Sequence, residues 1–187
     1  MLAPKDFSAR WGNDADSLIR FPKESVERLA LSDEDKEFLV QAGLPEDAAP
    51  FLGFQVPTTG ELRTVAEDWG QPAEFRCYRT LGSDGSGNPI AIDESHQGEV
   101  VCLDHENGFA RVLMNKSIRQ LAESLLAYRK TVKDTQAESG EDAFLDGKTS
   151  AAARDELRQA LTGIDPAAMK PGCFWHGELQ NLDANAG

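Results

Sequence analysis

The chain has 187 residues, with 19 lysines and arginines against 32 aspartates and glutamates, and a formal net charge of −13. That length suits one unit that buries a core without disulfides or metals, so we expect a single domain over residues 1–187. The acidity argues against nucleic acid and against anionic membranes as direct partners, because both require clustered positive charge on the protein. It suits a basic protein partner, or it simply keeps the chain soluble.

The N-terminal residues and the cysteines bear on the cellular compartment. Residues 1–12 contain no apolar run typical of a signal peptide, and nowhere do 18 apolar residues follow one another. The three cysteines, Cys77, Cys102 and Cys173, are odd in number and widely spaced, without the spacing of a redox motif. We therefore expect a protein of the reducing cytoplasm.

The N-terminal third predicts helices. After an irregular segment over residues 1–22, Val26 and Leu29 mark the apolar face of a first helix. A second helix follows Ser32, a good N-cap residue with three acidic residues after it, and Gly43 is a helix stop signal.

The middle of the chain predicts a mostly antiparallel sheet. Short apolar segments alternate with turn residues there, as in a meander rather than a series of crossover helices. The expected strands cover residues 51–56, 75–80, 89–93, 99–104 and 110–114. Among the turns between them, Asn107-Gly108 is the strongest hairpin signal.

Helices return after the sheet. Asn115 and Ser117 are alternative N-caps for an amphipathic helix that runs to about Val132, and a further helix is expected over residues 150–162. Between them, residues 134–149 form an acidic segment with glycines, which we expect to be an exposed loop. We expect Phe174 and Trp175 in the C-terminal tail to cover part of the sheet. The expected fold is α+β, with a central sheet of five to six strands flanked by N-terminal and C-terminal helices.

Two motifs at the first hairpin suggest ligands but are better explained by a turn. The cluster Gly82, Gly85 and Gly87 resembles a phosphate-binding loop, yet a strand follows it instead of the helix that would supply backbone amides. Asp84, Ser86 and Asn88 alternate as calcium ligands do, but the flanking helices and twelfth-position carboxylate of an EF-hand are missing.

Metal binding and catalysis have equally weak signals. Cys102 and His105 have ligand spacing, and His96, Cys173 and His176 could join them, but a zinc site normally shows two close pairs. No serine has the glycine pattern of a nucleophile elbow. A hydrolytic site of two carboxylates stays open on composition, although helix starts and turns explain most acidic residues. We predict no catalytic residue, no metal and no cofactor.

Five strings in order resemble one known family. They are FLVQAGLP, LGSDGSGNPIAID, GEVVCLDHENG, RVLMNKSIRQLAESLLAY and IDPAAMKPGCFW, and they span about residues 30–176. Their order and spacing resemble the SUKH superfamily, nearest to its fourth immunity-protein subfamily. This superfamily includes bacterial toxin-immunity proteins and fungal cell-wall synthesis regulators. Residues 1–22 and 134–149 match no motif in it.

The resemblance implies an α+β fold and a non-enzymatic protein that binds and neutralises a cognate toxin. Many such toxins act on nucleic acids and present basic surfaces, which agrees with the net charge. The alternatives are a regulatory scaffold similar to the cell-wall regulators and a small hydrolase with paired carboxylates. The oligomeric state stays open.

Acidic residues near the hairpin turns are the candidate partner-binding site. We expect a loosely clustered rim made of Asp84, Asp93, Glu94, Glu99, Asp104 and Glu106. The alternative is that these carboxylates are a solvated surface and that an apolar patch binds the partner, because Trp, Tyr and Arg dominate binding energy at interfaces. Gly82, Gly43 and Trp175 are assigned to the fold, as turn, helix stop and core residue.

Overall fold

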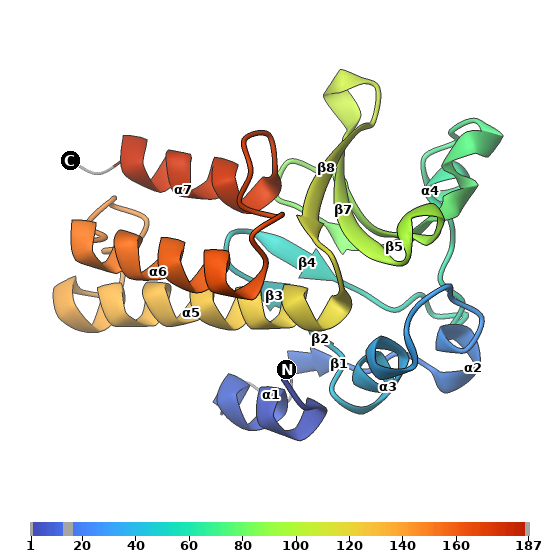
Figure 1. Cartoon of the computed structure of the whole chain (residues 1–187), viewed down its shortest axis with the longest axis horizontal. Helices are drawn as coiled ribbons and strands as arrows, with labels where there is room; N and C mark the ends of the chain where they lie inside the picture. The colour runs from blue at the N-terminus through green and yellow to red at the C-terminus, as the bar shows by residue number, and fades with distance from the viewer. Residues whose placement is uncertain (1, 13–16, 186–187) are drawn as a thin grey trace.

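The computed structural model describes residues 2–12 and 17–185. At its centre is a six-stranded sheet in which neighbours in sequence are neighbours in space and every pair is antiparallel (Figure 1). The strands are β3 (Asp47–Ala48), β4 (Leu52–Phe54), β5 (Tyr78–Ser83), β6 (Pro89–Asp93), β7 (Glu99–Asp104) and β8 (Ala110–Asn115). The predicted antiparallel sheet is confirmed.

Helices lie at both ends of the chain, as an α+β fold requires. The N-terminal elements are α1 (Pro4–Trp11), β1 (Leu18–Ile19), α2 (Lys23–Val26), α3 (Asp33–Gln41) and β2 (Leu44–Pro45), in which β1 and β2 pair as a small second sheet. The C-terminal helices are α5 (Ile118–Ser139), α6 (Ala151–Ile164) and α7 (Phe174–Ala184), which pack in succession beside the central sheet (Figure 1).

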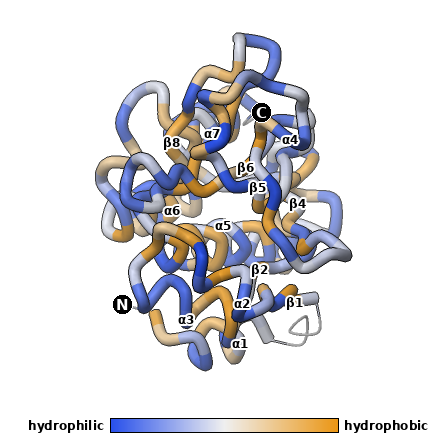
Figure 2. Tube along the Cα trace, turned by 90° about the vertical axis from the view of Figure 1, so that its right-hand side faces the viewer, coloured by the Kyte–Doolittle hydropathy of each residue, from blue (hydrophilic) through white to orange (hydrophobic). Residues whose placement is uncertain are grey.

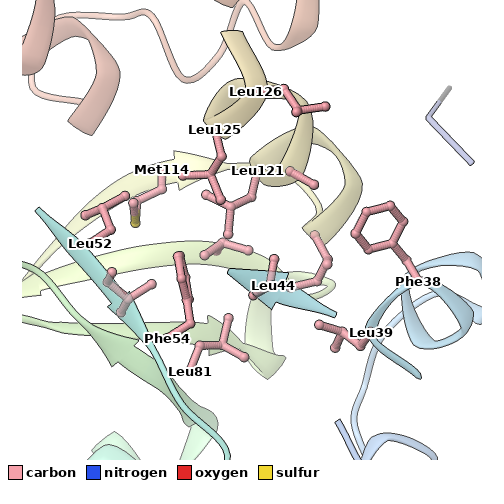
Figure 3. Packing of buried hydrophobic residues seen from close by; sticks show 14 of the residues in the cluster. Phe38, Leu39, Leu44, Leu52, Phe54, Leu81, Met114, Leu121, Leu125 and Leu126 are labelled. Atoms are coloured by element: carbon pink, nitrogen blue, oxygen red, sulfur yellow. The ribbon is translucent and has the colours of Figure 1, made fainter. Parts of the chain in front are cut away.

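The main core lies between the central sheet and α5. Alternation along the strands sends Ile90, Ile92 and Val100 to this side. Hydrophobic and hydrophilic residues alternate along α5 (Figure 2), and its buried residues, among them Ile118, Leu121 and Leu125, recur at the spacing of one helix face. Figure 3 shows side chains of the sheet packed against side chains of α5 and of the segment formed by α3 and β2. The labelled residues are Phe38, Leu39, Leu44, Leu52, Phe54, Leu81, Met114, Leu121, Leu125 and Leu126.

A smaller apolar cluster covers the opposite face of the sheet. Val65 of α4 (Val65–Asp68) packs there against Ala91, Val101 and Leu103. Half-buried aromatic residues border this cluster, among them Trp69, Phe75, Tyr78 and Phe109. The sheet therefore has apolar residues on both faces.

Trp175 is a core residue, as predicted, and it anchors α7. Its side chain is fully buried, and its indole Nε1 donates to Asn115 Oδ1 at 2.8 Å. Asp165 accepts from the backbone N of Lys116 at 2.8 Å. Satisfied buried polar groups of this kind fix the position of a helix more sharply than apolar contact alone.

Residues 1–22 are not irregular, which corrects the prediction for this segment. Residues 4–11 form α1, whose Phe7 is fully buried at 5.3 Å between ring centroids from Phe38 of α3. Trp11 is also buried, with the Arg129 guanidinium 4.3 Å from its ring centre. Contacts with distant parts of the chain thus stabilise a short helix with little periodicity of its own. Residues 1 and 13–16 of this segment lie outside the described residues.

The first expected helix is shorter than the prediction. It ends at Val26 as α2, although Leu29 is buried as expected. The backbone N of Ala30 donates to Glu94 Oε1 at 3.1 Å, so the chain beyond the helix bonds to the sheet instead of continuing the helix.

The second expected strand begins later than predicted. Residues 73–77 form a 3-10 turn, and β5 starts at Tyr78. Phe75 is not in a strand but packs in an aromatic group, with ring centroids 6.0 Å from Tyr78 and 5.6 Å from Phe109. Gly82 lies within β5 rather than in the turn. The position requires glycine because a Cβ there would lie 1.9 Å from the Gly53 carbonyl oxygen of the neighbouring strand.

Residues 134–149 are helical in their first part, which corrects the loop prediction. The helix α5 starts after Ser117, one of the two candidate N-caps, and continues to Ser139. Thr135 is buried there, with its Oγ1 3.4 Å from Thr149 Oγ1. The polar composition of residues 134–139 gave no indication of this burial, because threonine is polar yet small enough to be buried where two segments pack closely.

Candidate protein-binding surface

The six predicted acidic residues lie at two opposite ends of the sheet. Asp93, Glu94 and Glu99 surround the β6–β7 turn. The β5–β6 and β7–β8 turns, with the other three, lie at the other end, because successive antiparallel strands reverse direction. The length of β6 separates the two ends by roughly 15 Å. The structure therefore does not bring the six carboxylates into one rim.

The carboxylates at the β6–β7 end of the sheet form ion pairs within the protein. Asp93 is fully buried and accepts from Arg111 Nε at 2.8 Å, with His96 Nδ1 also 2.8 Å from its Oδ2. Arg111 pairs with Glu99 as well, and Glu99 pairs with Lys116. Burial opposes ionisation of Asp93, but hydrogen bonds from Ser95 and Arg111 outweigh it and lower the pKa of this carboxyl.

The pKa of Glu99 is lowered in the same way, since burial is outweighed by its bonds to Lys116 and Arg111. Glu94 accepts from Arg79 Nε at 2.7 Å and also holds the backbone of Ala30. These three carboxylates are therefore used within the protein, where they join strands to each other and to the N-terminal segment.

At the opposite end of the sheet, two carboxylates shape turns and one is free. Asp84 accepts from the backbone N of Ser86 and of Asn88, both at 2.9 Å. Asp104 accepts from the backbone N of Glu106 at 3.2 Å. The Glu106 side chain is exposed, and the described residues give it no hydrogen bond or ion pair. Asn88 Oδ1 accepts from the backbone N of His105 at 2.9 Å, which joins the two turns.

Two neighbouring cavities have volumes of about 570 and 480 Å³, and Asp84 lines the larger one. Both are lined by Pro50, Phe51, Phe144 and Leu145. The first also reaches Glu178 of α7, and the second reaches Val132 and Gln136 of α5. Burial raises the pKa of Glu178, and the nearby Asp84 carboxylate raises it further.

Sequence reasoning missed this region, although one signal pointed to it. Phe144-Leu145 is an apolar pair inside an otherwise acidic segment, a pattern that solvation does not explain. Phe51 was assigned to a strand, but it lies just before β4 with a positive φ of 60°. Glu178 carried no signal at all, because only the packing of α7 brings it near Asp84.

Two further candidates from the sequence are a metal site and the thiol of Cys102. Among the described residues, no group of three or more His, Cys, Asp or Glu side chains is placed to hold a metal ion. Cys102 is buried in β7 as expected, and its Sγ lies 3.7 Å from Asp84 Oδ2. Burial raises the pKa of its thiol, so the reactive thiolate is disfavoured.

A comparison of the sequence with protein-family models assigns the chain to a family. A family model described as "SUKH-4 immunity protein" matches residues 3–181. The chain belongs to the SUKH-4 immunity protein family. No curated protein and no solved structure matches it.

The SUKH-4 match includes both segments that sequence motifs left unexplained. It begins at residue 3, next to α1, and it runs through residues 134–149 to α7. Membership indicates a role in toxin immunity through binding of a cognate toxin, and immunity proteins are generally not enzymes. No helix in the described ranges of this SUKH-4 protein has the length and apolar character needed to cross a membrane.

Proposed function

We propose that this SUKH-4 protein is a cytoplasmic bacterial immunity protein that binds a basic toxin and neutralises it by contact, without catalysis. The family match over residues 3–181 carries the proposal. The net charge of −13 supports a basic partner, because complementary fields speed association and suppress wrong partners. A toxin that acts on nucleic acid, such as a nuclease, has the positive surface that this charge would attract.

Neutralisation would follow from steric and electrostatic occlusion of the toxin. An acidic protein seated on a phosphate-binding groove excludes the nucleic acid that the groove serves. The acidic residues at the β5–β6 and β7–β8 turns, Asp84, Asp104 and Glu106, are the part of the predicted rim that we propose for this contact. Asp93, Glu94 and Glu99 support it by holding the strands.

Co-expression with the toxin domain encoded beside the gene tests the proposal. We expect the protein to restore growth of cells that make this toxin, and the two chains to co-purify at low salt. Strong salt sensitivity of the complex would support a charge-steered contact, because salt screens exposed charges. Cell death with no complex at low salt would contradict the proposal.

A further inference from the structure

Two large apolar side chains are exposed among the described residues, and the fold brings them to one place. Phe51 is 72% exposed and Leu145 is 71% exposed. Both line the two cavities described above, together with Pro50 and Phe144. We call this region, with Asp84 and Glu178 at its side, the Phe51–Leu145 groove. Contiguous exposed apolar residues of this kind mark interaction sites on soluble proteins.

The segment that carries Leu145 is anchored on both sides. Ala143 is buried, and the Phe144 ring lies 5.9 Å from the Tyr128 ring, measured between centroids. Gly147 packs so closely on the end of α7 that a Cβ there would lie 2.1 Å from the carbonyl oxygen of Asn185. Leu145 is therefore held in the exposed position by an ordered turn, as a preformed contact requires.

Phe51 is also held outward. Its positive φ is a backbone conformation that residues with a side chain rarely adopt. The β5–β6 turn passes close beside it, since a Cβ added at Gly85 would lie 2.9 Å from Phe51 Cβ. The ring consequently projects from a fixed position next to Asp84.

Every charged residue that lines the groove is acidic. Asp84 and Glu178 line the larger cavity and Asp47 lines the smaller, and within the described part of the chain no Lys, Arg or His lines either. The negative charge of Asp84 repels that of Glu178 and raises the pKa of the Glu178 carboxyl. A cation between them would remove that repulsion.

We propose that the Phe51–Leu145 groove is the docking site for the toxin, and that it takes a Lys or Arg side chain flanked by apolar residues of that protein. The cation lies between Asp84 and Glu178, while Phe51 and Leu145 pack on the apolar neighbours. This inference rests on the proposed function and names the surface that performs it. A second copy of the chain is the wrong occupant, because two molecules of charge −13 repel each other.

The first arm of the test measures binding of the toxin domain encoded beside the gene to wild type and to F51N/L145S. Asn tolerates the positive φ at position 51, so the variant keeps the fold. We expect its Kd to rise about 30-fold or more, as at an interface hot spot. Glu178→Gln should raise the Kd about tenfold, because it removes one carboxylate from the cation site.

The matched control is Glu34→Gln, an exposed carboxylate on α3. The helix α3 meets the start of α5, where Asp35 accepts from the backbone N of Arg119 at 3.1 Å, whereas Gln136 in the groove lies near the helix end. Removal of the same charge so far away should change Kd by less than about twofold.

The second arm uses a probe that does not depend on the toxin. Phenethylguanidinium, an apolar ring joined to a cation, is titrated into the wild-type protein while backbone amides are followed by NMR. We expect shifts at Phe51, Leu145 and Glu178, with affinity about tenfold higher than for neutral phenethyl alcohol. The same titration into Glu178→Gln should reduce that preference.

The outcomes separate the two claims. A toxin complex that F51N/L145S weakens supports the groove, and a complex of equal affinity overturns it while the proposed function stands. If wild type binds no toxin, the proposed function fails for that toxin and the fragment titration decides the groove. Shifts confined to the groove with preference for the cation then support it, and no shift or no preference overturns it.

Discussion

Asp93 joins three elements of the sheet through one buried carboxylate. It accepts from Arg111 of β8, contacts His96 in the β6–β7 turn and caps that turn through Ser95. A buried ion pair stabilises little against an apolar replacement, but removal of one partner leaves the other charge unpaired. The residue is therefore a point where a single change has a large structural cost.

Asp93→Asn should lower the free energy of unfolding by about 2–4 kcal/mol near neutral pH, because Arg111 then loses one of its two carboxylates. The pKa of Asp93 is lower in the folded protein, so its contribution is present above the unfolded-state pKa of about 3.9 and is lost as the pH falls through the folded value. Denaturant unfolding at several pH values measures both effects.

The variant should lose less stability than wild type on acidification, because one of the carboxylates that must be protonated is gone. Glu106→Gln, which removes an exposed carboxylate, is the control and should leave the pH profile unchanged. Parallel profiles for wild type and Asp93→Asn would refute the role assigned to this carboxyl.

At the scale of elements, Gly43 joins the N-terminal helices to the small sheet. It ends α3 as predicted, with a φ of 76°. A Cβ there would also lie 2.0 Å from the carbonyl oxygen of Ile19 in β1. The sequence showed the helix stop but not this close approach, since β1 and its register with β2 depend on tertiary packing.

Gly43→Ala should destabilise the protein by about 2–4 kcal/mol, because the new methyl group must push β1 from β2. Gly70→Ala is a matched control, with a similar φ of 62° and no atom within 4 Å of its Cβ position. It should lose only about 1 kcal/mol, the cost of the left-handed backbone. Equal losses in thermal or urea unfolding would show that the close approach to Ile19 carries no energy.

The sequence predicted the elements that short local patterns specify, and it failed for the elements that depend on contacts between distant residues. Strands β6 and β7 have the predicted bounds, and Ser117 caps α5, because alternation and capping are properties of short segments. The helix α1 was missed, since Phe7 is buried only by contact with Phe38 and other distant residues. The extension of α5 beyond Val132 was missed for the same kind of reason.

At the scale of the whole molecule, charge and apolar surface converge at one end of the sheet. Asp84 belongs both to the predicted acidic rim and to the Phe51–Leu145 groove. From sequence alone the carboxylates near turns were visible, but their separation to opposite ends follows from strand order. Phe51 and Leu145 are distant in the chain, and only the folded structure places them together.

The triple variant D84N/D104N/E106K should weaken toxin binding about tenfold and flatten its salt dependence. Asn keeps one acceptor oxygen for the backbone amides of each turn, while D84N loses the bond from Asn88 Nδ2 to the second Asp84 oxygen. Affinity measured at low and high salt checks this expectation.

The control, E24Q/E27Q/E34K, carries the same change in charge at exposed positions in α2, directly after α2 and in α3. It should cost less than about threefold in affinity, because a distant exposed charge is largely screened. Equal effects of the two triple variants would show that the net charge of the protein, and not the specific carboxylates at the hairpin turns, determines the affinity.

The most direct measurement of the central claim is titration of the toxin's own activity with the purified protein. The toxin is the domain encoded beside the gene, and its rate is followed as the protein is added. We predict that activity falls in proportion to added protein and is abolished near one equivalent, as direct occlusion requires. Full toxin activity in the presence of a large excess of protein would contradict the account.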